Sequence, residues 1–91
     1  MILTFKCKET EKLYHGRFVK RFAGIERQSR IRLRILDAAP HLLALSNLRS
    51  NHFESLKGDR KGQYSIRINS QWRICFQWDK GATDVEIVDY H

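Results

Sequence analysis

Residues 64–78 contain two stretches in which apolar and polar side chains alternate, one on each side of the polar break 69–71. A period of two is typical of a β-strand with one buried face, so the pattern predicts an antiparallel hairpin. If 69–71 is the loop, the register gathers the apolar residues of both stretches on one face. These residues are Tyr64, Ile66, Ile68, Trp72, Ile74, Phe76 and Trp78.

The same register places Arg67 directly opposite Arg73 on the other, polar face of the hairpin. Two guanidinium groups at opposed positions destabilise an isolated sheet, but they suit a site where an anion such as phosphate binds between them. The alternative is that the two side chains splay apart into water, with their stems packed on the sheet. The hairpin pattern leaves both interpretations open.

The remaining stretches predict a small α+β fold. Helical spacing and end signals favour helices over 8–15 and 25–39, with Ile31 and Ile35 among the core residues of the second. Between them we expect a loop held to the core by Phe18 and Phe22, and the alternative is that these aromatic rings stack on RNA bases. The other expected elements are strands over 1–7 and 83–91, a leucine-rich turn over 41–48, an extended stretch over 52–56 and a tight charged turn over 58–62.

The expected architecture is a mostly antiparallel twisted sheet with the N-terminal helices packed on one face. A chain of 91 residues can bury one modest core, so we expect a single domain over residues 1–91.

The charge balance limits the partners of this domain. Seventeen Lys and Arg against ten Asp and Glu give a formal net charge of +7, which favours an acidic polymer such as RNA. No apolar run approaches the roughly 20 residues that span a bilayer, and the first residues lack the apolar run of a signal peptide. We therefore expect a cytoplasmic protein without a membrane partner, in which Cys7 and Cys75 are free thiols.

Two further basic groups are candidates for RNA contact. Arg30 and Arg34 lie on the polar side of the predicted 25–39 helix, which is either a solvated face or a surface that follows an RNA backbone. Lys57, Arg60 and Lys61 project from the glycine-bounded turn, whose backbone N–H groups and cations can cradle a phosphate. Neither signal is specific by itself.

The last three residues are the best candidates for chemistry. The four histidines and two cysteines lack zinc-type spacing, so no metal or other cofactor is expected. RNA cleavage needs only a base for the 2′-OH proton, an acid for the 5′-oxygen and cations for the phosphate. His91 is the candidate acid, and Glu54, Asp89 or Tyr90 is the candidate base. The expected electrostatic clamp consists of Lys57, Arg60, Arg67 and Arg73.

At this point the sequence resembles the HigB-type toxins of the RelE superfamily, over nearly its whole length. The resemblance rests on the run 56–62, on the segments 65–67 and 72–74, and on the closing Asp89-Tyr90-His91. It implies the RelE-like fold and a toxin of a type II toxin–antitoxin system that cleaves mRNA in the ribosomal A site without metal. It also implies three partners: the 70S ribosome with its mRNA, a HigA-type helix-turn-helix antitoxin and, only through that antitoxin, operator DNA.

Carried across the resemblance, the family's terminal acid, tyrosine and histidine match the last three residues, and its basic sheet residues match Arg67 and Arg73. One position differs from the pattern of the family, because Glu54 stands where some members have a histidine. His52, two positions earlier, would share its strand face, but the alignment favours Glu54. The change is expected to weaken catalysis or to move the base role elsewhere.

Two other functions remain open from the sequence. One is a non-catalytic RNA-binding or ribosome-binding domain, which Glu54 favours. The other is a DNA-binding co-repressor that acts only with its antitoxin.

Overall fold

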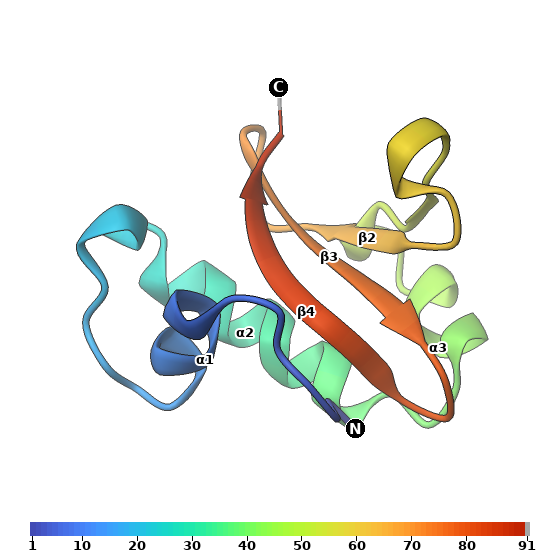
Figure 1. The fold of residues 1–91 in the computed structure, drawn as a ribbon, viewed down its shortest axis with the longest axis horizontal. Helices are drawn as coiled ribbons and strands as arrows, with labels where there is room; N and C mark the ends of the chain where they lie inside the picture. The colour runs from blue at the N-terminus through green and yellow to red at the C-terminus, as the bar shows by residue number, and fades with distance from the viewer. Residues whose placement is uncertain (91) are drawn as a thin grey trace.

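The structure, a computed structural model, describes residues 1–90 as three α-helices and a four-stranded sheet (Figure 1). The sheet is antiparallel throughout, with strand order β1-β2-β3-β4. This confirms the α+β prediction. The helices are α1 (Lys8–Tyr14), α2 (Glu26–Ala38) and α3 (Leu42–Asn47), and the strands are β1 (Glu54–Ser55), β2 (Tyr64–Arg67), β3 (Trp72–Trp78) and β4 (Ala82–Asp89).

The predicted hairpin and its register are confirmed. Ile66 pairs with Ile74 and Arg67 pairs with Arg73 across β2 and β3. The loop closes through the side chain of Asn69, whose Oδ1 accepts hydrogen bonds from the backbone N–H groups of Gln71 and Trp72, both at 2.8 Å. An Asx turn of this kind is a local feature, which is why the sequence was sufficient to place the loop.

The apolar face of the hairpin packs against α2, which lies behind the sheet in Figure 1. Leu33 and Leu36 of α2 are fully buried in the same core cluster as Ile66 and Ile74. The predicted helix 25–39 is confirmed to within one residue at each end. The prediction for Ile31 is wrong, since it is 45% exposed and points away from the sheet-facing side of the helix.

The prediction of a strand over 1–7 is correct only in part. The segment runs along β4 in parallel and exchanges backbone hydrogen bonds with it, but it pairs at two isolated bridges, Ile2 to Ala82 and Phe5 to Val85, and forms no regular strand. Between these bridges Asp84 has a left-handed backbone, with φ of 51°. Left-handed geometry interrupts the alternation on which a continuous ladder depends.

Only half of the prediction for the loop after α1 is correct. Phe22 ends the short 3₁₀ turn Lys20–Phe22 and is fully buried, with its ring 5.7 Å from the ring of Trp72 in an edge-on arrangement. Phe18 is 70% exposed, so it does not hold the loop to the core. A single aromatic residue therefore anchors this loop.

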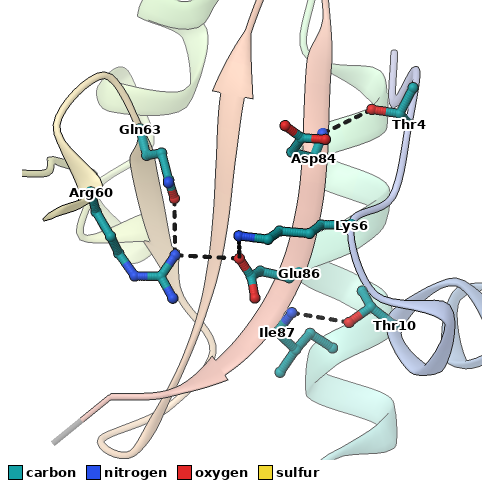
Figure 2. Close-up of polar contacts among 8 residues, drawn as sticks. All are labelled: Thr4, Lys6, Thr10, Arg60, Gln63, Asp84, Glu86 and Ile87. Atoms are coloured by element: carbon teal, nitrogen blue, oxygen red, sulfur yellow. Dashed lines mark hydrogen bonds and ion pairs between the residues drawn. The ribbon is translucent and has the colours of Figure 1, made fainter.

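Two threonine hydroxyls attach the N-terminal region to β4 (Figure 2). Oγ1 of Thr10 accepts from the Ile87 N–H at 3.0 Å in a buried position, and Oγ1 of Thr4 accepts from the Asp84 N–H at 2.8 Å in an exposed one. We expect Thr10→Val to lower the free energy of unfolding by about 1–3 kcal/mol, because the buried amide loses its acceptor. Urea denaturation of the purified protein measures this change.

Thr4→Val is the matched control for Thr10→Val. Water replaces the lost hydroxyl at the exposed Asp84 amide, so the expected change is below about 0.5 kcal/mol. Equal losses for the two variants would show that burial of the amide is not what makes the Thr10 bond important.

Candidate functional site

The polar face of the sheet carries a pocket where the hairpin loop meets the end of β4. Its volume is about 300 Å³. It lies on the side of the sheet opposite to the hydrophobic core, because its arginines alternate with the buried residues of β2 and β3. The lining residues are His52, Glu54, Arg67, Asn69, Ser70, Arg73 and Tyr90.

Arg73 is the structural centre of this pocket and is only 7% exposed. Its Nε donates to Oγ of Ser65 at 2.8 Å, and one terminal nitrogen donates to the backbone carbonyl of His52. The other terminal nitrogen lies 3.3 Å from Oε1 of Glu54. A planar guanidinium held from three directions has one orientation, so the charge is presented to the pocket with little freedom.

Arg67 is the more available of the two arginines. Its Nε donates to the backbone carbonyl of Asn69 at 3.0 Å, and no acidic side chain among residues 1–90 forms an ion pair with it. The two opposed arginines therefore share one pocket, as the anion-site interpretation requires. The splayed alternative is wrong for Arg73, whose head group is buried.

The end of β4 is tied to the hairpin loop next to this pocket. The Tyr90 N–H donates to the Gln71 carbonyl at 2.6 Å, and Nε2 of Gln71 donates to Oδ2 of Asp89 at 3.1 Å. The Tyr90 ring faces the Arg73 guanidinium at 5.7 Å, a cation–π distance. His91 lies outside the described residues, so its position relative to the pocket stays a prediction.

The other predicted cations lie outside the pocket lining. Lys57 and Lys61 are exposed in the turn between β1 and β2, and Arg60 pairs with Glu86 at 3.3 Å. Arg30 donates to the carbonyls of Leu13 and Arg17 at the end of α1. Arg34 is exposed on α2, a helix that packs on the opposite face of the sheet. RNA contact by these five residues stays a prediction.

Sequence reasoning missed two pocket residues and set a third aside. Asn69 and Ser70 were assigned only to the loop, although their position between two opposed arginines was a signal that they face the same site. The alignment favours Glu54 over His52, yet both residues line the pocket. A left-handed backbone at His52, with φ of 44°, turns the chain just before β1.

Two further kinds of feature can be assessed in the described part of the chain, metal-binding clusters and membrane-spanning helices. Among residues 1–90 there is no cluster of three His, Cys, Asp or Glu side chains that could hold a metal ion. In the same residues no helix is long and apolar enough to cross a bilayer.

A basic α+β domain with its helices on one sheet face and an arginine-centred pocket on the other belongs to the class of small RelE-like proteins. A family profile described as the RelE-like toxin HigB of type II toxin–antitoxin systems matches residues 3–91. The chain therefore belongs to the HigB-like toxin family, and membership of a type II system implies an antitoxin as its partner.

Two curated relatives support this assignment. The chain is 41% identical over 96 aligned positions to a protein of Vibrio cholerae serotype O1 named Toxin HigB-1, covering 100% of this chain and 98% of the relative. It is 39% identical over 61 positions to the Endoribonuclease HigB of Proteus vulgaris, covering 66% of this chain and 65% of the relative.

Proposed function

We propose that this toxin is a metal-independent endoribonuclease that cleaves mRNA in the ribosomal A site and so inhibits translation. Family membership supports a toxin, and the name of the Proteus vulgaris relative supports RNA cleavage. The observation that carries the proposal is the pair of opposed arginines, Arg67 and Arg73, in one pocket with Tyr90.

The proposed reaction uses the nucleophile that RNA already contains. The 2′-oxygen attacks the adjacent phosphorus, a base removes the 2′-OH proton, and the P–O bond to the 5′-oxygen breaks as an acid protonates that oxygen. The products are a 2′,3′-cyclic phosphate and a 5′-hydroxyl. Negative charge builds up on the phosphate in the transition state, where a fixed cation is most effective. Arg73 and Arg67 would supply that charge.

The proton-transfer roles fall to the residues at the pocket and the end of the chain. His91 is the proposed acid, and Asp89 and Tyr90, which precede it in the sequence, are the other residues proposed to take part. Glu54 is the proposed base, since its side chain is 52% exposed and its carboxylate is held next to Arg73. The same ion pair competes for the carboxylate, which supports our expectation that this toxin is a weak nuclease.

The proposed partners follow from the family and the charge. They are the 70S ribosome with its mRNA, a HigA-type antitoxin with a helix-turn-helix domain, and operator DNA through that antitoxin. Lys57, Arg60 and Lys61, together with Arg30 and Arg34, are proposed to contact RNA backbone phosphates. The net charge of +7 favours such contacts.

Purified toxin mixed with 70S ribosomes programmed with a defined mRNA tests the proposal. We expect cleavage at the A-site codon, none without ribosomes, and no inhibition by a zinc-selective chelator. His91→Gln should abolish cleavage while leaving the folded state intact. Arrested translation with uncut mRNA for the unchanged toxin would instead identify a non-catalytic ribosome-binding protein. This is the second candidate function, and the Glu54–Arg73 ion pair favours it.

A further inference from the structure

A second polar cluster on the pocket side of the sheet is centred on Glu86 of β4. Figure 2 shows its carboxylate between the side chains of Lys6 and Arg60. Oε2 of Glu86 lies 3.5 Å from Nζ of Lys6 and 3.3 Å from Nη1 of Arg60, which also donates to Oε1 of Gln63 at 2.9 Å. One carboxylate therefore joins the N-terminal segment and β4 to the turn between β1 and β2.

The Arg60–Glu86 pair crosses the middle of the sheet. Glu86 is opposite Cys75 of β3, and Cys75 in turn is opposite Ser65 of β2. Arg60 belongs to the turn that precedes β2, so its side chain reaches over β3 to contact β4. Cys75 below is fully buried, and burial raises the pKa of its thiol. Cys75 is two positions from Arg73 along β3, so the two side chains share a face of the sheet. The Arg60–Glu86 pair therefore lies on the same face as Arg73.

The turn that Arg60 anchors has few other attachments. The strand before it, β1, has only two residues and pairs with β2 alone at the edge of the sheet. A backbone hydrogen bond of 2.9 Å from Leu56 to Gln63 closes the base of the turn. Gly58 and Gly62 both have positive φ, of 65° and 90°. The backbone bonds inside the turn fix its shape but not its position over the sheet, so a contact from outside, such as the Arg60–Glu86 pair, restricts that position.

We infer that Glu86 is a positioning residue for RNA binding: through Arg60 it holds the turn 57–62, with the exposed Lys57 and Lys61, on the face that carries the arginine pocket. The inference rests on the proposed function, because RNA is the ligand that the two lysines would contact. Glu86 is only 16% exposed and already neutralised by two cations, so it presents little negative charge to an approaching phosphate. Its effect on RNA therefore acts through the position of the turn.

Charge alone predicts the opposite outcome, which makes the inference testable. Glu86→Gln adds one unit of positive charge to an RNA-binding face, and long-range attraction would then lower the KM for mRNA. Loss of the Arg60 anchor instead lets the turn adopt several positions. Lys57 and Lys61 are then less often placed to bind RNA, so the KM rises. The sign of the change separates the two mechanisms.

The experiment measures mRNA cleavage on programmed ribosomes for the unchanged toxin and for Glu86→Gln. We expect the KM to rise about fivefold, as for loss of a good ion pair, while kcat stays within about twofold. Hydrogen exchange of the Leu56 and Gln63 amides should accelerate in the variant. In a background of Lys57→Ala and Lys61→Ala, Glu86→Gln should raise the KM no further, because the residues it positions are gone.

Glu9→Gln is the matched control for the charge change. It breaks an ion pair with Arg21 of the same 3.3 Å length, but this pair is exposed and lies away from the turn. We expect no change in KM or in exchange at Leu56. If Glu86→Gln fails to fold, Arg60→Gln removes the same anchor from the other side and should show the same acceleration of exchange.

Several outcomes overturn the inference. An unchanged or lowered KM for Glu86→Gln contradicts it, and so does a lowered kcat with constant KM, which would place the effect at Glu54 and Arg73. Absence of cleavage by the unchanged toxin is a failure of the proposed function. In that case unchanged exchange at Leu56 in Glu86→Gln would separately show that the carboxylate does not hold the turn.

Discussion

Replacing Arg73 with alanine is expected to lower the single-turnover rate of mRNA cleavage by roughly 10³-fold. The variant removes a buried charge that is fixed by Ser65, His52 and Glu54, and a preorganised donor at a developing negative charge contributes about 10²–10³ in rate. It also breaks the ion pair between Arg73 and the Glu54 carboxylate. The rate is measured with excess toxin over ribosome-bound mRNA, and circular dichroism checks that the variant is folded.

Arg73→Lys is the informative control. An ammonium keeps the positive charge but cannot donate in three directions from one plane, so Ser65 and the His52 carbonyl lose their partner. We expect the logarithm of the cleavage rate to fall by at least half as much for Arg73→Lys as for Arg73→Ala. Full activity of the lysine variant would mean that net charge is sufficient, and that the orientation of the guanidinium is irrelevant to the reaction.

Phe22→Ala is expected to cause the largest loss of stability, about 3–5 kcal/mol in the free energy of unfolding. Phe22 is fully buried and packs edge-on against Trp72, so truncation removes apolar burial and leaves a cavity under the hairpin. For a domain of this size such a loss lowers the melting temperature by roughly 12–40 °C. Thermal and urea unfolding at fixed pH measure both quantities.

Phe18→Ala, four residues earlier in the same loop, removes the same side chain from a position that is 70% exposed. We expect a change of less than about 0.5 kcal/mol. If the two alanine variants were equally destabilised, the loop would be anchored by both rings. The sequence-based expectation for Phe18 would then be correct after all.

The hairpin and α2 were predictable because their signals are local and strong. Alternation with a period of two determines which side chains share a face, and an Asn-led loop determines where the chain reverses. The opposition of Arg67 and Arg73 follows directly from that register. The predictions that failed concern places where packing overrides the local sequence pattern. Asp84 has a left-handed backbone that prevents a continuous N-terminal strand, and Phe18 and Phe22 have equal hydrophobicity but unequal burial.

The candidate site was predictable only in part. The sequence identified Glu54, Arg67, Arg73 and Tyr90, all of which line one pocket. It had no means of assigning Arg30 to the carbonyls at the end of α1 or Arg60 to Glu86, because these bonds join residues 17 and 26 positions apart. Asn69 and Ser70 were likewise visible as loop residues but not as pocket residues.

By itself, then, the sequence determined the strand register, the main helix and the face on which two arginines meet, since each follows from the repeat of neighbouring residues. Only the tertiary structure decided which arginines also bond to internal carbonyls and carboxylates, as Arg30 and Arg60 do. The physical reason is that the guanidinium lies at the end of a long side chain, so its partner is whichever carboxylate or carbonyl the fold brings close to it, whatever their separation in the sequence.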